Sequence, residues 1–184
     1  MKLLRFFIII FISLTSPIKA ELYKNLINQL KDGEKLIFIR HAYAPGNGDP
    51  AGFNLNDCST QRNLSEDGKK QAQRIGEFFN KNKIEIDKVL SSEWCRCKET
   101  AKIAFKNYST NSFLNSFYSS KFSKNKDKQV NAFNNYIKDL GNKNLILVTH
   151  YVFISEVLNY GSSSGEIVVS DKNFNIIGNI EIDF

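Results

Sequence analysis

Short runs of consecutive apolar residues alternate along the chain with stretches whose apolar residues recur three or four positions apart. The continuous runs at residues 35–40 and 144–149, bounded by turn residues, predict strands that are buried on both faces, and residues 86–90, 166–169 and 173–184 are also predicted to form strands. The spaced pattern predicts helices, and it covers residues 21–32, 65–82, 93–107, 129–140 and 151–160. We expect residues 108–128 to form an excursion over the sheet, because their serine, asparagine and aromatic residues follow no clean period.

Strands that alternate with helices predict an α/β fold. We expect a three-layer α/β/α sandwich with a mostly parallel central sheet, to which the last two strands add an antiparallel edge. The 184 residues contain no internal repeat and no linker, so residues 21–184 are expected to form one domain.

Both histidines of the chain directly follow a buried strand. The run at residues 36–39 leads into Arg40 and His41, and the run at residues 144–149 leads into His150. The carboxyl ends of strands in an open parallel sheet form the ligand crevice, so we expect these side chains to meet there. Taken singly, either histidine is also consistent with a capped residue of the core.

Four segments, in the same order along the chain, resemble the motifs of the histidine phosphatase superfamily, which has a phosphoglycerate-mutase-like fold. Together they span roughly residues 36 to 170. They are Ile39–Ala42, which resembles the Arg-His-Gly signature; Asn63–Ala72, which resembles a Leu-(Ser/Thr)-x-x-Gly-x-x-Gln-Ala helix start; Ser91–Ala101, which resembles Ser-Ser-x-x-x-Arg-x-x-x-Thr-Ala; and Val148–His150, which resembles the motif of the second histidine.

The resemblance implies a phosphomonoesterase that works through a phosphohistidine intermediate. His41 is then the nucleophile, with its other ring nitrogen held by a backbone carbonyl, and histidine is one of the side chains that form such intermediates. Arg40, Arg96 and His150 are expected to bind the phosphoryl oxygens, since the guanidinium fork matches phosphate geometry. The expected partner is a small phosphorylated substrate, with an envelope sugar phosphate as one candidate. No cofactor and no metal are expected.

The chain departs from the superfamily pattern in ways that leave the general acid open. Ala42 replaces the signature glycine, which is a mild change. Tyr151 stands where one branch has an acidic aspartate, and residues 107–122 lack the glutamate that the other branch uses. Asp57 and Glu93 lie near motif residues and, with Tyr151, are the candidate acids. A missing acid also suits a catalytically weak protein that binds phosphate ligands; a phosphohistidine protein phosphatase is a further alternative.

The loop at residues 43–62 is long for a compact domain, and such loops are usually functional. We expect it to frame the active site and, with residues 108–128, to select the substrate. Arg62, at its end, is either a third phosphate contact or a brace for the loop. The run at residues 161–165 reads as a turn in preference to a phosphate cradle.

The first 20 residues resemble a secretory signal peptide. Lys2 and Arg5 precede an apolar run at residues 6–12, and Ala20 offers a small residue for cleavage. An uncleaved anchor is the alternative. Cleavage would lower the formal charge from +6 to +3, because Lys19 also leaves and no acidic residue does. The mature protein is thus expected to be periplasmic or secreted and without a membrane span.

The three cysteines are Cys58, Cys95 and Cys97, a spacing that does not suggest a zinc site. Export favours oxidation, and we expect a disulfide from Cys58 to one of the other two, with the remaining thiol buried. Such a bond would brace the loop over the pocket. The modest positive charge suits an anionic substrate, and no basic stripe with interleaved aromatics points to nucleic acid.

Overall fold

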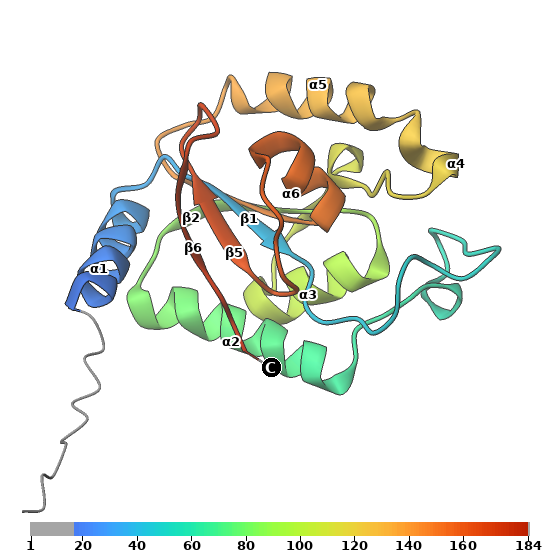
Figure 1. Cartoon of the computed structure of the whole chain (residues 1–184), viewed down its shortest axis with the longest axis horizontal. Helices are drawn as coiled ribbons and strands as arrows, with labels where there is room; N and C mark the ends of the chain where they lie inside the picture. The colour runs from blue at the N-terminus through green and yellow to red at the C-terminus, as the bar shows by residue number, and fades with distance from the viewer. Residues whose placement is uncertain (1–16, 184) are drawn as a thin grey trace, which may run out of the picture.

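The computed structural model describes residues 17–183, which form one central sheet with helices on both sides (Figure 1). Residues 1–16, which hold most of the predicted signal peptide, lie outside the described residues. The elements follow in the order α1 (Pro17–Asp32), β1 (Leu36–Arg40), the 3-10 turn η1 (Cys58–Thr60), α2 (Glu66–Asn82), β2 (Ile86–Ser91), α3 (Cys95–Phe105), β3 (Ser109–Thr110), the 3-10 turn η2 (Ser112–Leu114), α4 (Ser120–Ser123), α5 (Lys126–Ile137), β4 (Asn144–Thr149), α6 (Tyr151–Leu158), β5 (Ile167–Ser170) and β6 (Ile176–Ile180).

The six strands lie in the order β3-β2-β4-β1-β5-β6. The β3–β2, β2–β4 and β4–β1 pairs are parallel, whereas β5 runs antiparallel to β1 and β6 antiparallel to β5. The predicted three-layer α/β/α architecture is confirmed, with its mostly parallel sheet and antiparallel edge. The parallel order matters for function because β1 and β4, each followed by a histidine, are direct neighbours.

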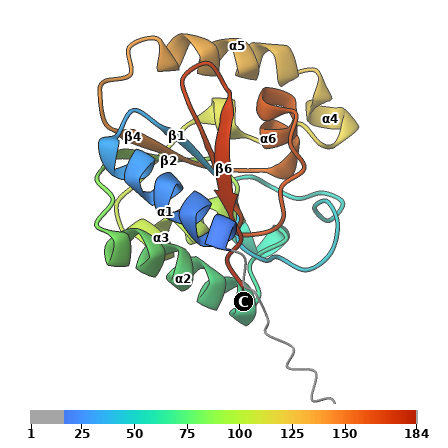
Figure 2. The ribbon, with the colours of Figure 1, turned by 60° about the vertical axis from the view of Figure 1, so that its left-hand side comes forward.

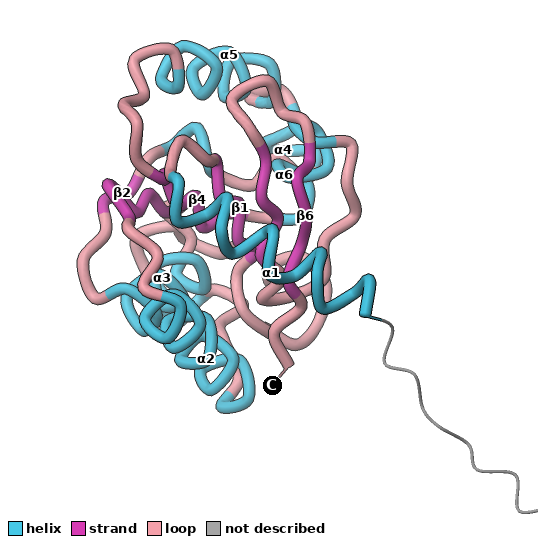
Figure 3. Tube along the Cα trace, turned by 90° about the vertical axis from the view of Figure 1, so that its left-hand side faces the viewer, coloured by secondary structure: helices cyan, strands magenta, loops and turns pink. Residues whose placement is uncertain are grey.

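The three strands at the centre of the sheet, β4, β1 and β5, are buried on both faces, and their successive side chains point to opposite sides of the sheet. In β1, Ile37 and Ile39 pack with α1, α2 and α3, while Leu36 and Phe38 pack with α5 and α6. Figures 2 and 3 show the same division, with α1, α2 and α3 below the sheet and α5 and α6 above it. Continuous apolar runs are therefore what this sheet requires.

The start of α2 is fixed by its cap and by one glycine. Ser65 is the N-cap, and its hydroxyl accepts a hydrogen bond from the Gly68 N–H at 3.1 Å. A Cβ on Gly68 would lie 1.9 Å from the carbonyl oxygen of Tyr43. The helix thus packs directly on the backbone just after His41, and only glycine permits this approach.

The predicted boundaries differ from the structure where propensity is weak. Helix α1 begins at Pro17 and not at residue 21, since proline suits a first helical turn. Helix α5 begins at Lys126 and ends at Ile137, three residues before each predicted boundary. The excursion at 108–128 contains β3, η2 and α4, which are too short to leave a periodic pattern. Within residues 17–183, no helix has the length and apolar character needed to cross a membrane.

Candidate active site

The ends of β1 and β4 bring the two histidines together. Arg40 pairs with Thr149 in the parallel register, and the His41 N–H donates to the Thr149 carbonyl at 2.9 Å. The imidazoles of His41 and His150 are both buried, and their centroids lie 5.5 Å apart. The expected convergence of the two strand ends is present in the structure.

The ring of His41 is held in a defined orientation. Its Nδ1 lies 2.8 Å from the carbonyl oxygen of Ala42, the kind of backbone contact expected for a histidine nucleophile. The Ala42 N–H in turn donates to the Thr100 hydroxyl at 3.0 Å. Burial, followed by the charge of Arg96, lowers the pKa of His41 well below its ordinary value. The imidazole is therefore neutral, with Nδ1–H donated to the carbonyl and Nε2 free as a base.

The ring nitrogens of His150 contact three side chains, those of Arg96, Ser92 and Cys97, with the Cys97 Sγ 3.5 Å from Nε2. Arg96 Nη2 lies 3.4 Å from its Nδ1, and because a guanidinium only donates, Nδ1 is the acceptor. The remaining proton is on Nε2, which lies 2.9 Å from the Ser92 hydroxyl. Burial and the charge of Arg96 lower the pKa of His150 well below its ordinary value. Arg96 thus fixes the tautomer of this ring, and the hydroxyl of Ser92, from the predicted Ser-Ser element, accepts from Nε2–H.

Arg96 lies on the first turn of α3 and is paired with a carboxylate. Its Nη1 lies 2.7 Å from Oδ1 of Asp49, and its Nη2 lies 3.3 Å from Oδ2, which makes the pair bidentate. Both side chains are largely buried, with exposed fractions of 3% for Arg96 and 11% for Asp49. Trp94 Nε1 donates to the same carboxylate at 3.0 Å.

Arg40 and Arg62 complete the positive charge. Arg40 Nη1 donates to the Ser162 carbonyl at 2.7 Å, and its guanidinium lies 5.7 Å from the ring centroid of Tyr151. Arg62 donates from Nε to the Gly48 carbonyl at 2.7 Å and from Nη1 to the Ala44 carbonyl. These bonds hold the 43–62 loop closed on itself, while Arg62 also lines the pocket.

The disulfide joins Cys58 to Cys95, so it ties the loop to the residue next to Arg96. This confirms the predicted bond from Cys58 and assigns its partner. Cys97 is free and buried, also as predicted, and burial raises the pKa of its thiol to about 12.

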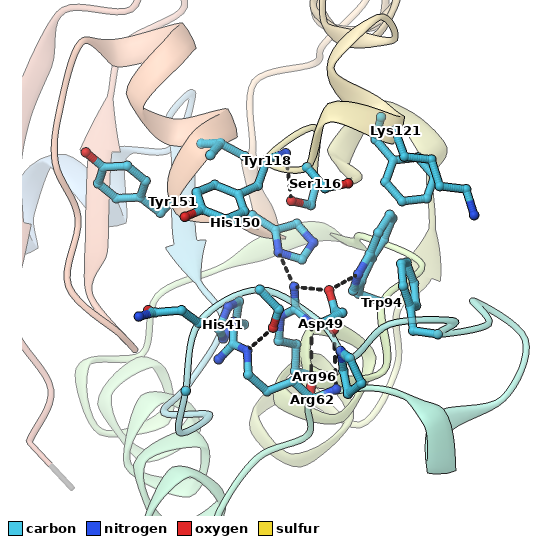
Figure 4. A pocket seen from close by; sticks show the side chains of 18 of the residues that line it. His41, Asp49, Arg62, Trp94, Arg96, Ser116, Tyr118, Lys121, His150 and Tyr151 are labelled. Atoms are coloured by element: carbon cyan, nitrogen blue, oxygen red, sulfur yellow. Dashed lines mark hydrogen bonds and ion pairs between the residues drawn. The ribbon is translucent and has the colours of Figure 1, made fainter.

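These side chains line one cavity of about 370 Å³, whose inner end is formed by the arginines and histidines (Figure 4). The outer part is lined by aromatic residues from the 43–62 loop, the start of α3 and residues 116–122. Both segments expected to contact the substrate therefore reach the pocket. The polar and charged side chains lining it are Arg40, His41, Asn47, Asp49, Arg62, Arg96, Ser116, Ser119, Lys121 and His150, with the hydroxyls of Tyr118 and Tyr151.

The three candidate acids do not occupy the inner pocket. Asp57 is exposed and caps η1 through Ser59, and Glu93 accepts from the Asn115 amide. Tyr151 lines the pocket but is 44% exposed. The carboxylate that the sequence analysis missed is Asp49. The sequence could have indicated Asp49 as a candidate, since Asp49 and Asp57 are the only acidic residues of the 43–62 loop. Its contact with Arg96 could not be predicted, because the two residues are 47 positions apart.

No cluster of three or more potential metal-ligating side chains occurs in the part of the chain that the structure describes.

The site and fold were compared with known proteins. A sequence model described as "Histidine phosphatase superfamily (branch 1)" matches residues 36–115, which contain the first three motifs. Over these residues the chain matches the histidine phosphatase superfamily. The resemblance indicated by the motifs is thereby confirmed, and the fourth motif, Val148–His150, lies beyond the matched segment. No curated protein matches the chain in sequence.

Solved histidine phosphatase structures share the fold at low sequence identity. The protein histidine phosphatase SixA complexed with tungstate has a TM-score of 0.54 and 15% identity, over 81% of this chain and 96% of that one. A putative phosphohistidine phosphatase SixA from Agrobacterium tumefaciens gives 0.57 and 16%, over 81% and 99%. Phosphoglycerate mutase from Thermus thermophilus gives 0.57 and 17%, over 81% and 99%. These similarities establish the fold.

Proposed function

We propose that the protein is a phosphatase that transfers the phosphoryl group of a small phosphorylated substrate first to His41 and then to water. The observation that carries this proposal is the state of His41: a buried neutral ring with Nδ1 tied to a carbonyl, Nε2 available, and three arginines beside it. A neutral imidazole nitrogen is a nucleophile, and surrounding guanidiniums stabilise the charge that develops on the phosphoryl oxygens.

Two buried guanidinium nitrogens support the anion-binding role. Nε of Arg40 and Nε of Arg96 are both buried, and neither has a hydrogen-bond partner among the described residues. A buried donor without a partner is costly. Phosphoryl oxygens bound between these arginines would accept from both groups, so the energetic cost is recovered when the substrate binds.

The substrate class follows from the outer pocket. Its aromatic lining and Lys121 suit a phosphomonoester whose leaving group carries a ring and further polar or anionic groups, such as a sugar phosphate. The fold similarity to proteins described as phosphohistidine phosphatases supports a second candidate, hydrolysis of phosphohistidine on another protein.

We propose that the protein is exported, and export distinguishes these candidates. The support is the signal-like N-terminus of the sequence and the Cys58–Cys95 disulfide, which persists in oxidising compartments. An envelope phosphomonoester would be available there. Phosphorelay proteins are usually cytosolic, and the phosphomonoesterase is for this reason the leading candidate.

The test is hydrolysis of p-nitrophenyl phosphate by the wild type and by His41→Ala. We expect turnover by the wild type and a loss of roughly 10³-fold or more in the variant. A labelled phosphoenzyme, stable to base and labile to acid, is expected only in the wild type. Turnover that persists in His41→Ala would reject the mechanism, and tight phosphate binding without turnover would favour the binding protein.

A further inference from the structure

The carboxylate of Asp49 lies where an anionic substrate would be expected to bind. It accepts hydrogen bonds from both terminal nitrogens of Arg96, from Trp94 Nε1 at 3.0 Å and from the Arg62 N–H at 3.3 Å. In Figure 4, Asp49 lies between His41 on one side and Trp94 on the other. The carboxylate therefore uses the same donors that would serve a phosphoryl group.

Asp49 is the only carboxylate among the described residues that line the cavity. The other acids near the motifs are engaged elsewhere: Asp57 is exposed at η1, and Glu93 is bonded to Asn115. Any proton delivered within the pocket by a carboxyl group must consequently come from Asp49.

Substrate binding creates an electrostatic conflict at this position. In the free protein burial acts to raise the pKa of Asp49, but the hydrogen bond and charge of Arg96 hold it below its ordinary value, so the carboxyl is ionised. A dianionic phosphoryl group beside it would share the same guanidinium. Two anions in one site raise the pKa of one of them strongly, and the pair takes up a proton when the substrate binds.

We propose that Asp49 is the general acid of this phosphatase, and that the charge of the bound phosphoryl group is what places the proton on it. The proposal rests on the phosphatase function proposed above. The substrate competes with Asp49 for Arg96, and the carboxyl group released from that ion pair holds the proton needed by the leaving oxygen. This role of Asp49 would explain why the chain has no acidic residue at residue 151 or within residues 107–122, where the two branches of the superfamily have their general acid.

The proposed reaction has two steps. In the first, the Nε2 lone pair of His41 forms the P–N bond, the P–O bond to the leaving group breaks, and the Asp49 carboxyl protonates the departing oxygen. In the second, water attacks phosphorus, the Asp49 carboxylate takes its proton, and the P–N bond breaks to return His41 and release inorganic phosphate. One water is consumed, and Asp49 ends as it began.

The charge state of Asp49 depends on several groups that face the same pocket. Positive charge comes from three arginines and one lysine, while both histidines are neutral in the free protein. The nearby Cys97 thiol is also neutral, since burial raises its pKa to about 12. The charged and titratable groups lining the pocket around Asp49 are Arg40, His41, Arg62, Arg96, Tyr118, Lys121, His150 and Tyr151.

The leaving group provides the decisive test. We expect Asp49→Asn to lower kcat/KM for glycerol phosphate by about 10²-fold or more, because its alkoxide needs a proton. The value of kcat/KM for p-nitrophenyl phosphate should change by less than about 3-fold, because p-nitrophenolate leaves without a proton and kcat/KM does not include the hydrolysis of the phosphoenzyme. Across a series of aryl phosphates, the dependence of rate on leaving-group pKa should be steeper in the variant. Asp57→Asn, in the same loop, is the matched control and should leave both rates unchanged.

The alternatives give different results. Equal losses on both substrates would make Asp49 a residue that only positions Arg96, and equal gains would make it only a competitor of the substrate; either outcome overturns the proposal. An unaltered dependence on leaving-group pKa also overturns it. Base-stable phosphoenzyme in Asp49→Asn shows that the proposed function holds in the variant, whereas its absence from the wild type would reject that function itself.

A measurement on the wild type alone covers the case in which Asp49→Asn fails to fold. Because the acid must be protonated in the complex, the pH profile of kcat for glycerol phosphate should have a basic limb, in which kcat falls at high pH. The profile of kcat for p-nitrophenyl phosphate should lack this basic limb. The same basic limb on both substrates would overturn the proposal.

Discussion

His41 and His150 occupy equivalent positions on neighbouring parallel strands, since the residues before them, Arg40 and Thr149, are register partners. Their ring centroids lie 5.5 Å apart although 109 positions separate them in the sequence. Parallel pairing places equivalent residues side by side, so the site requires no special backbone to bring the two imidazoles together. The register of β1 and β4 alone accounts for their convergence.

Both imidazoles are expected to stay neutral below pH 6.5. Burial and Arg96 lower the pKa of each ring below that ordinary value, and the chain has only two histidines, so their NMR signals are readily followed. We expect no titration of either ring near pH 6.5 and a shift to higher pKa in Arg96→Gln. Titration of His41 at or above pH 6.5 in the wild type would contradict the electrostatic account.

The same shifts predict how stability depends on pH. Each histidine has a lower pKa in the folded state than in the unfolded chain, so below about pH 6.5 the unfolded state binds more protons. The free energy of unfolding should therefore fall as pH decreases from about 6.5 to 5, a range above the titration of ordinary carboxyl groups. Urea unfolding across that range measures this slope. In His41→Asn the slope should be shallower, and an unchanged slope would refute the contribution of His41.

The predictable part of this protein consists of local patterns, and the unpredicted part consists of contacts made by an irregular loop. The run before His41 and the run before His150 are continuous and apolar, and both strands lie within one residue of their predicted bounds. Ser65 is recognisable as a cap because capping depends on neighbouring residues. Asp49 has no such signature: its partner Arg96 is brought to it by the tertiary fold, and the loop between them follows no period.

The disulfide illustrates the same limit. The sequence indicated Cys58 as one partner of the disulfide. Either Cys95 or Cys97, which flank Arg96, could have been the other. Cys95 and Cys97 differ in direction once they lie on α3: Cys95 faces the loop, and Cys97 faces the sheet, where its Sγ lies 3.6 Å from the Thr149 carbonyl. Helical geometry therefore decided a pairing that spacing alone left open.

Loss of the disulfide should destabilise the protein. The bond closes a segment with a sequence separation of 37, and the chain-entropy estimate for such a loop is about 3–4 kcal/mol. We expect the Cys58→Ser, Cys95→Ser double variant to lose about that much unfolding free energy in urea. Catalysis should also weaken, because the loop holds Asp49 against Arg96. Cys97→Ala should retain the wild-type sensitivity to reductant; three titratable thiols in the oxidised native protein would contradict the assignment.

The aromatic wall, formed by Phe53, Trp94 and Phe122, should contribute to binding of the leaving group. Its three ring centroids lie 5.6 to 5.8 Å from one another. Phe122→Ala is expected to raise KM for phenyl phosphate by about 2- to 10-fold, the range given by one aromatic pair. Inhibition by inorganic phosphate, which has no leaving group, should not change. Tyr23→Ala, at an exposed site on α1, is the control variant. An equal loss of affinity for inorganic phosphate in Phe122→Ala would contradict the role of the aromatic wall in binding the leaving group.

Gly68 should be essential to the geometry around His41. Its Cβ position is occupied by the Tyr43 carbonyl, and Tyr43 is only two residues from the nucleophile. Gly68→Ala must displace either α2 or this backbone, and such overpacking costs about 1–3 kcal/mol.

The chain offers a matched control in Gly141, where an added Cβ meets nothing within 4 Å. Gly141→Ala should leave the unfolding free energy within about 1 kcal/mol of the wild type. Thermal unfolding and p-nitrophenyl phosphate turnover of both variants test this, because Gly68→Ala should lower both quantities and Gly141→Ala neither. Equal behaviour of the two would show that α2 yields without disturbing the backbone that carries His41.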